Sequence, residues 1–498
     1  KALELGQWAA AEHVELLARL GAVANAAGRG ALAGGAFQRA ASLASGAERL
    51  ELMRRAAQAF MSSGHQQQGE RLLGEVLRAV GRAPPRSPAR VIALYLWERW
   101  KLGRRGLSRR PRPLSATRRQ RLEAVDVASA LWMNHNPALS WTYAKRELRW
   151  ALDGDDDALL LRALSRELVF ASTELQHGSW SEALVELGRQ LAASVRDPAV
   201  LALYELALTL RSFVVGHWGE AEQRARAVEQ RLRTQCTGVH WELALVRRVY
   251  VASIQIGGDM LAAEPLILDW LKDAEQRDDR EGIVTHLLGL AYCHLCHDAP
   301  ERIQPLLERS RRLLLGAHSG AFNLFWIEAI ALCYAGAPRS ALSAVLQRLR
   351  SVHRSANGRV LFYRVWTRGY ESRVLAALAL AARGRERERW LSELRRLERQ
   401  LLAEPWPYAV SIAKQIEASV LWLGGAREPA ACALDESARI HERAGARLFA
   451  AVARFASARV RGDHSALERA RSEIVALQVR DVDRMARAHL PAFWPAPG

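Results

Sequence analysis

The sequence predicts an all-α protein, an α-solenoid of about ten antiparallel helical hairpins. An apolar helical stretch, a tight turn and a second helical stretch recur along the 498 residues. The later turns recur every 38 to 48 residues, a period typical of stacked two-helix repeats. No stretch shows sustained alternation of apolar and polar residues, so we expect essentially no β-sheet. The turn markers are Gly28, Gly64, Gly178, Gly216, Gly257, Asp298, Gly336, Gly384, Gly424 and Gly462.

Residues 14–80 contain the clearest pair of repeats. Small and apolar side chains fall at Leu17, Leu20, Gly21, Ala24, Ala33, Phe37 and Ala40, and again at Ala57, Phe60, Gly69, Leu73 and Val76. These spacings follow the tetratricopeptide pattern, although leucine and alanine replace its tryptophan and tyrosine. The small residues allow two helices to approach closely, and Phe37 is expected to fill the gap between them. We therefore assign N-terminal tetratricopeptide-like repeats to residues 1–80.

Residues 81–125 interrupt this rhythm. Prolines restrict long helices at both ends of the segment, at positions 84, 85, 88, 111 and 113. Between them, Val91 to Leu102 predicts one short helix that carries Trp97 and Trp100, and Gly103 to Arg119 predicts an exposed loop. We interpret the segment as a Pro/Arg-rich basic insertion with a short helix.

The tetratricopeptide-like repeats resume over residues 126–490. Carboxylates at 153–157 precede the apolar run from Ala158 to Val169, as expected at the positive end of a helix. Residues 243–256 carry apolar side chains on two helical faces, which suits a helix packed between neighbouring repeats. Asp463 begins the final hairpin. The Pro-rich tail, residues 491–498, is not expected to be helical, and its aromatic side chains are expected to pack on the last repeat.

The composition is that of an ordinary soluble protein, with 50% hydrophobic residues, 25% charged residues and a mean hydropathy of −0.12. No apolar stretch reaches the roughly 18 uncharged residues that a membrane span requires, so no membrane span is predicted. Five cysteines without the spacing of a disulfide framework indicate buried thiols and a reducing cytoplasm. Because the chain opens with Lys1 and shows no leader, we expect it to be a piece of a longer protein.

The basic charge of the chain is local. The net charge is +18, and residues 82–121 hold thirteen Arg or Lys and one acid, which gives +12 for this segment. Such a segment can contact an acidic protein surface, phosphates or anionic lipid, or it can be a solvated loop that its own repulsion extends. The candidate partner-binding residues are Trp97, Trp100, Arg104, Arg105, Arg109, Arg110, Arg112, Arg118, Arg119 and Arg121.

No catalytic, cofactor or metal site is predicted. Cys293, Cys296 and His297 form a C-x-x-C-H pattern, which attaches haem in some proteins and contains zinc-ligand residue types. Neither a leader nor a second ligand pair accompanies it, so buried thiols in a core are the preferred interpretation. The glycines at 28–34 lack phosphate-loop spacing, and the acids at 153–157 lack the glycine and closing acid of a calcium loop. Since no nucleophile, base and orienting group assemble, the chain is not expected to be an enzyme.

Several short motifs follow one another in the first third of the chain: Leu16-Leu-Ala-Arg-Leu-Gly21, Asn25-Ala-Ala-Gly-Arg-Gly30, Arg54-Arg-Ala-Ala57, Ser63-Gly-His65, Val80-Gly81 and Arg104-Arg-Gly-Leu107. Together they resemble the C-terminal tetratricopeptide-like repeat region of bacterial proteins that join a serine/threonine kinase domain to an AAA-type, STAND-like ATPase module. The resemblance is clearest over residues 4–175. It implies a tail that senses a partner or ligand and controls the kinase and the ATPase. Kinase and Walker motifs are missing from the sequence, so no catalytic or nucleotide-binding residue is carried over.

Three functions are compatible with these observations. The first is a non-catalytic protein-interaction or sensor region that regulates a signalling serine/threonine kinase–ATPase, with signalling proteins as partners. The second is the repeat arm of an ATP-dependent transcriptional regulator that associates with nucleic acid through residues 82–121. The third is a sensor that binds a small molecule in the concave groove of the solenoid.

Overall fold

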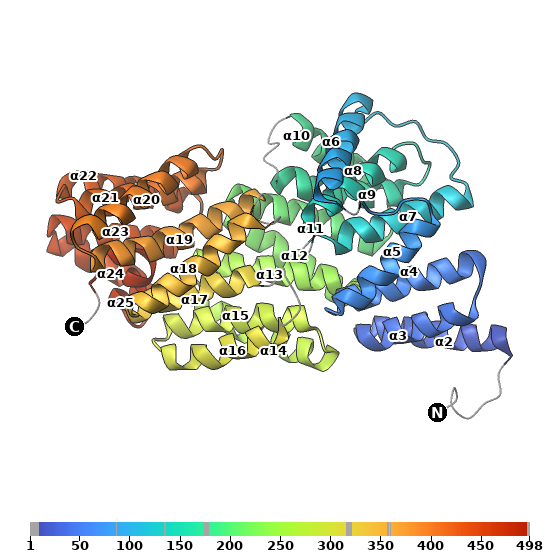
Figure 1. Ribbon diagram of the computed structural model, residues 1–498, viewed down its shortest axis with the longest axis horizontal. Helices are drawn as coiled ribbons and strands as arrows, with labels where there is room; N and C mark the ends of the chain where they lie inside the picture. The colour runs from blue at the N-terminus through green and yellow to red at the C-terminus, as the bar shows by residue number, and fades with distance from the viewer. Residues whose placement is uncertain are drawn as a thin grey trace. The chain divides into compact units, whose positions relative to one another are not determined.

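The computed structural model describes residues 9–85, 87–133, 136–173, 179–314, 321–355, 358 and 360–495, and in these residues the protein is all-α (Figure 1). Twenty-four α-helices account for the regular structure of this part of the chain, which contains no β-strand. A single isolated β-bridge joins Arg112 to Gly154 within the described residues. The predicted all-α helical-repeat fold is therefore confirmed.

The helices of the first half are α2 (Ala10–Ala26), α3 (Gly30–Leu43), α4 (Gly46–Ser62), α5 (Gln66–Ala79), α6 (Pro88–Arg105), α7 (Ala116–Leu131), α8 (Pro137–Ala151), α9 (Asp157–Thr173), α10 (Ser179–Ser194), α11 (Pro198–Val215), α12 (Trp218–Gln235) and α13 (His240–Gly257). Those of the second half are α14 (Met260–Arg277), α15 (Arg280–Cys296), α16 (Ile303–Leu313), α17 (Ala321–Ala335), α18 (Arg339–Arg354), α19 (Leu361–Ala381), α20 (Gly384–Leu402), α21 (Pro407–Leu423), α22 (Arg427–Arg443), α23 (Arg447–Arg461), α24 (His464–Ala476) and α25 (Val482–His489). Short 3-10 helices occupy Pro300–Arg302 (η1) and Pro491–Phe493 (η3).

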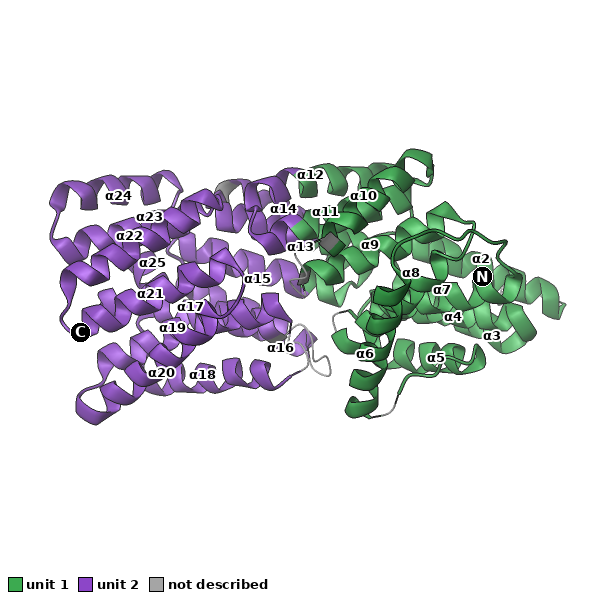
Figure 2. Cartoon of the chain, turned by 90° about the horizontal axis from the view of Figure 1, so that it is seen from above, with its two compact units in different colours: residues 1–211, 224–247, 272–283 green, residues 212–223, 248–271, 284–498 purple. Residues whose placement is uncertain are grey.

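The chain forms two compact units, coloured separately in Figure 2. Unit 1 comprises residues 1–211, 224–247 and 272–283, and unit 2 comprises residues 212–223, 248–271 and 284–498. The division passes through helices α11 to α15, so each of these helices contributes one end to each unit.

In unit 1, helices α2 to α5 pack in chain order, each against the next. The positions of the tetratricopeptide pattern form their core: Leu17, Ala33 and Phe37 are buried. A Cβ atom added at Gly21 would lie 2.7 Å from the ring of Phe37, and one added at Gly34 would lie 2.7 Å from the ring of Phe60. The predicted close approach, with an aromatic ring seated on a small residue of the preceding helix, is therefore confirmed and occurs twice in succession.

The predicted turn markers lie where two consecutive helices meet. Each of the nine markers in the described part of the chain lies at or within one residue of such a turn, and Gly178 lies outside the described residues. Six of the marker glycines have a positive φ, such as 72° at Gly28 and 96° at Gly216, a backbone conformation that costs glycine little. At two turns the positive φ falls one residue later than predicted, at Gly258 and Gly425.

In unit 2, helices α17 to α24 also pack in chain order, and the C-terminal segment returns onto them. Helix α25 packs on α17, and the 3-10 helix η3 packs on α19. Phe493 lies 5.8 Å from Trp422 and Trp494 lies 5.5 Å from Phe455, measured between ring centroids. The predicted packing of the tail aromatics on the last repeat is therefore confirmed for Trp494, which meets α23, whereas Phe493 packs on the earlier helix α21. A short 3-10 helix forms where no helix was expected, while residues 496–498 lie outside the description.

Of two composition-based expectations, the absence of a clear membrane span is supported and the burial of all five thiols needs correction. Helix α11 passes a length-and-composition test for a membrane span, but it contains Glu205 and Arg211 and 56% of it is buried within the protein, as in the core helix of a helical bundle. It is the one such helix among the described residues and is weak evidence, so no clear membrane span is found there. Of the five free thiols, Cys293, Cys296 and Cys333 are buried as expected, but Cys432 is exposed and Cys236 is half-buried.

Candidate functional site

Helix α6 is held to unit 1 by one face. Ser87 caps its first turn by accepting a hydrogen bond from the Arg90 amide, and Pro88 occupies the first helical position, where no donor is needed. The helix is therefore longer at both ends than the predicted span from Val91 to Leu102. Its inward face carries Glu98, whose buried carboxylate accepts hydrogen bonds from Arg146 at 2.9 Å and Arg149 at 3.1 Å, both on α8.

The opposite face of α6 presents apolar side chains to solvent. The described residues include ten exposed large apolar side chains, and four of them lie on this helix: Ile92, Leu96, Trp97 and Trp100. We call this set, with Lys101 and Arg104, the α6 aromatic face. Such a concentration on a single helix is unusual, because large exposed apolar side chains normally occur singly.

The two indoles of the α6 aromatic face stack on each other. Their ring centroids are 5.0 Å apart and their planes differ by 15°. The ammonium group of Lys101 lies 4.5 Å from the ring centroid of Trp97, and the guanidinium of Arg104 lies 5.0 Å from that of Trp100. Cation–π attraction and the i, i+3 and i, i+4 spacing organise these four side chains before any partner binds.

Three arginines at the end of α6 and beyond it are tied to the acidic residues 153–157 of the same unit. Arg105 pairs with Asp153 at 2.6 Å, and Arg119 pairs with Asp156 at 3.0 Å. Arg109 makes a third pair, with Asp157. These pairs join the end of α6, the following loop and the first turn of α7 to the acidic residues around the start of α9.

Main-chain contacts complete this attachment. The amide of Arg110 donates to the carbonyl oxygen of Leu152 at 3.0 Å, and that of Arg112 donates to Asp153 at 3.2 Å. The prediction of an exposed loop from Gly103 to Arg119 is therefore confirmed only for its middle, residues 106–115, which form a mostly exposed loop. Both ends of the predicted loop are helical, and the loop is tied to unit 1 by these ion pairs and hydrogen bonds.

The acids at 153–157 have two roles. The predicted capping role is confirmed for Asp156, whose carboxylate accepts a hydrogen bond from the Leu159 amide at 3.0 Å. The three ion pairs with arginines were not predicted, because Asp153 and Arg105 lie 48 residues apart in the sequence. The sequence signal for these ion pairs was a run of arginines and a run of acids, separated by one helical hairpin.

The ten predicted partner-binding residues thus fall into three groups. Trp97, Trp100 and Arg104 lie together on the α6 aromatic face. Arg105, Arg109 and Arg119 hold the segment to the acidic residues 153–157. Arg110, Arg112 and Arg118 are exposed, Arg121 is half-buried, and none of these four has a carboxylate partner in the described residues.

The thiols of the C-x-x-C-H pattern are core residues of unit 2. Cys293 and Cys296 are fully buried on α15. Burial raises the pKa of the Cys293 thiol to about 12, and it raises that of Cys296 as well. Metal binding and sulfur chemistry require the thiolate, which these surroundings disfavour. Partial burial also lowers the pKa of the neighbouring His294.

A second cluster of functional residue types lies inside unit 1. Burial, reinforced by the Asp126 carboxylate, raises the pKa of Glu147 to about 8. Although burial opposes it, Arg166 and Arg162 lower the pKa of Asp126, to which Arg166 donates a hydrogen bond at 2.7 Å. The adjoining cavity, lined by Ser129 and Arg166 among others, has a volume of about 20 Å³. A space of this size suits a water molecule, and substrate pockets are far larger. We therefore interpret the cluster as a buried charge network.

No protein-family model matches this chain, and no curated protein matches its sequence significantly. Functional interpretation therefore depends on the geometry of the surfaces described above.

Proposed function

We propose that this chain is a non-catalytic helical-repeat region that binds a protein partner through the α6 aromatic face. The observation that supports this proposal is the stacked pair of exposed indoles on a helix whose other face is anchored by a buried carboxylate. Tryptophan and arginine are the side chains that most often contribute strongly to protein–protein binding. A rigid aromatic pair also loses little conformational entropy when it is covered.

The partner segment that fits this face is an amphipathic helix with acidic residues beside its apolar side. Ile92 and Leu96 provide apolar area next to the indoles, and Lys101 and Arg104 provide positive charge at their edge. An acidic rim on the partner would pair with these cations and would also speed association. Because helices pack by ridges and grooves, a second helix is the natural complement to an exposed helical face.

An alternative is that the chain is the repeat arm of a transcriptional regulator and binds nucleic acid. The exposed and uncompensated Arg110, Arg112 and Arg118 favour it. Two observations weigh against it. Asp153, Asp156 and Asp157 already engage three arginines of the segment. Each indole also already has the other indole stacked on it and a cation over it, while single-stranded nucleic acid binds by base stacking on open rings.

We further propose that binding of the partner regulates a serine/threonine kinase joined to an ATPase module. The support for this step is the sequence resemblance of residues 4–175 to the repeat tails of such proteins. In this role the chain would act in the cytoplasm, and its free thiols suit that compartment. On this proposal, the kinase activity of the parent protein should change when the double variant Trp97→Ala/Trp100→Ala is introduced into its repeat region.

The binding proposal is tested with the isolated chain and its natural cell extract. We expect the wild-type chain to retain a partner at 0.5 M salt, and we expect Trp97→Ala/Trp100→Ala to lose it. Leu402→Ala, which removes an exposed apolar side chain from α20, is the matched control and should retain the partner. Equal recovery by wild type and the tryptophan double variant would contradict the proposal.

The same material tests the alternative. If nucleic acid is the partner, duplex DNA binding should weaken steeply with salt and should fall when Arg110, Arg112 and Arg118 are changed to glutamate. If these changes leave DNA binding unaltered, the nucleic-acid function fails.

A further inference from the structure

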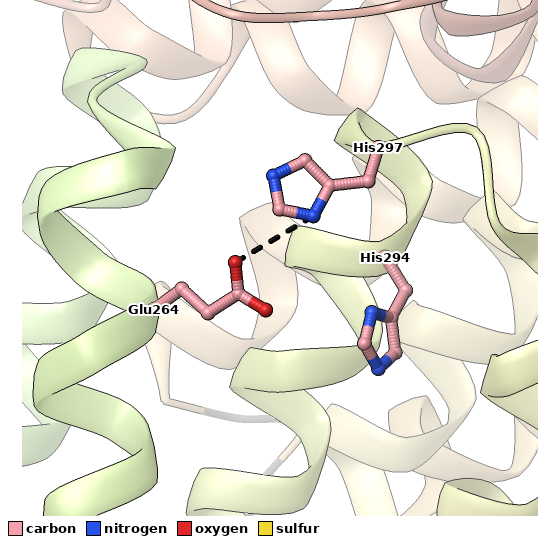
Figure 3. A group of neighbouring side chains, drawn as sticks. All are labelled: Glu264, His294 and His297. Carbon is pink, nitrogen blue, oxygen red and sulfur yellow. Dashed lines mark ion pairs between the residues drawn. The ribbon is translucent and has the colours of Figure 1, made fainter.

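Three side chains of unit 2 bring potential metal ligands together between α14 and α15. Glu264 lies in the second turn of α14, His294 lies in the last turn of α15, and His297 follows the end of that helix. One ligand atom from each residue lies within 4.8 Å of the others. The Nδ1 atom of His297 is 3.5 Å from a carboxylate oxygen of Glu264. Figure 3 shows both imidazoles on one side of the carboxylate and facing it.

The backbone explains why these side chains meet. His294 and His297 are three residues apart, so both lie on the side of α15 that faces α14. The two helices also approach closely earlier in α15, where a Cβ atom added at Gly289 would lie 3.2 Å from Ile267 of α14. The Nδ1 atom of His294 is buried and has no hydrogen-bond partner in the described residues. An imidazole nitrogen without a partner beside a carboxylate is available as a ligand.

We propose that Glu264, His294 and His297 bind a divalent transition-metal ion of the zinc class. Zinc is bound by histidine nitrogen and carboxylate oxygen at bond lengths of about 2.0–2.2 Å, which places neighbouring ligand atoms of a tetrahedron about 3.3–3.6 Å apart. The pair formed by His297 and Glu264 already has this separation. The third ligand atom reaches it by a shift of about 1 Å, within the range of a side-chain rotation.

The donor set also selects the class of metal. Two imidazoles suit zinc, cobalt, nickel and copper, whereas calcium and magnesium prefer oxygen ligands. Three protein ligands leave a fourth position, which water can fill. The fully buried thiols of Cys293 and Cys296 are not part of this cluster.

A metal at this position would join α14 to the end of α15. Both helix segments belong to unit 2, and the ion would link them through side chains 30 and 33 residues apart in sequence. Binding to the folded chain alone would stabilise unit 2 by mass action.

The test uses tag-free protein that has been treated with a chelator and then titrated with zinc chloride by calorimetry. We expect one ion per chain, and at least a tenfold weaker affinity in His294→Ala and in Glu264→Gln. Glu264→Gln preserves side-chain shape, so it separates lost ligation from lost folding. His217→Ala is the matched control, because His217 is exposed and faces Glu220 at 3.7 Å with the i, i+3 spacing of a helix. It should bind zinc as wild type does, and zinc should raise the melting temperature of wild type and of this control only.

Two results would overturn the proposal. The first is equal zinc affinity in wild type, His294→Ala and Glu264→Gln. The second is a cobalt-substituted protein whose absorption shows thiolate-to-metal charge transfer, because that band would assign the ion to cysteine. The variant Cys432→Ser, which removes the exposed thiol, should leave the zinc titration unchanged.

Discussion

Two adjacent glycines of α3 provide a sharp test of how the N-terminal repeats pack. A Cβ atom added at Gly34 would lie 2.7–2.8 Å from three ring atoms of Phe60, whereas one added at Gly35 would meet no atom within 4 Å. Alanine is favoured over glycine inside a helix by about 1 kcal/mol. Gly35→Ala should therefore raise the free energy of unfolding of these repeats by about that amount.

The same change at Gly34 carries an additional cost. Carbon atoms in contact are normally about 3.5–4.0 Å apart, so the Phe60 ring would have to move by about 1 Å within a buried site. Overpacking of this kind costs about 1–3 kcal/mol, which offsets the gain in helix propensity. We expect Gly34→Ala to be neutral or to destabilise by up to about 2 kcal/mol, so the two variants should differ by about 1–3 kcal/mol.

Hydrogen exchange resolved to individual helices is the appropriate assay, because a chain of this length need not unfold in one step. Gly35→Ala should slow exchange in α3 and α4 by about fivefold, and Gly34→Ala should leave it unchanged or accelerate it. In a Phe60→Leu background, Gly34→Ala should destabilise the repeats less, because the ring that the added methyl group meets has been removed. If Gly34→Ala protects these amides as much as Gly35→Ala does, the packing of the ring on the glycine is refuted.

Three further predictions concern stability. Lys145 and Glu167 form a buried pair at 3.0 Å. Lys145→Met should therefore destabilise unit 1 by about 3–5 kcal/mol in urea unfolding, and adding Glu167→Leu should recover most of the loss. In the folded protein the pKa of Glu147 is raised from 4.5 to about 8. Between these two pH values Glu147 is ionised in the unfolded chain and still protonated in the folded one, so wild type should lose stability as pH rises from about 4.5 to 8. Glu147→Gln should lack this slope in melting temperature, and a slope equal to that of wild type would show that Glu147 is not its source. Asp463 caps α24 by accepting from the Ala466 amide at 2.9 Å, so Asp463→Ala should cost about 1 kcal/mol in hydrogen exchange of α24, while Asp463→Asn should cost little.

Much of the fold follows from local sequence. Glycine turns and apolar periodicity are short-range signals, and they predicted the helical-hairpin fold and the nine described turn markers to within one residue. The pattern at Leu17, Gly21 and Phe37 also predicted which side chains form the first core, because close helix packing depends on residue size at fixed spacing. Two of the predicted turn markers, Gly257 and Gly424, are one residue too early, because the glycine that follows each of them has the positive φ.

The candidate sites were less accessible to sequence reasoning, for a physical reason. Three consecutive charged residues, Lys145, Arg146 and Glu147, would normally indicate a solvated helix face, yet all three are buried because α8 is surrounded by its neighbours. The partners of charged residues come from other helices, such as Glu167 for Lys145 and Glu264 for His297. Such pairings depend on tertiary contacts and leave no local pattern. The α6 aromatic face was predicted in part, since its tryptophans stand out within a basic segment.

The attachment of residues 106–115 makes this segment sensitive to its ionic surroundings. The ion pairs of Arg109 and Arg119 are partly solvated, so dissolved ions weaken them, whereas the two main-chain hydrogen bonds are affected much less. In dilute buffer the ion pairs and hydrogen bonds hold this exposed segment on unit 1, and in concentrated salt its middle is freer to detach. Trypsin, which needs an extended and detachable strand, would then cut after Arg109 faster as salt increases. The rate at which trypsin cleaves this segment should therefore increase with salt concentration.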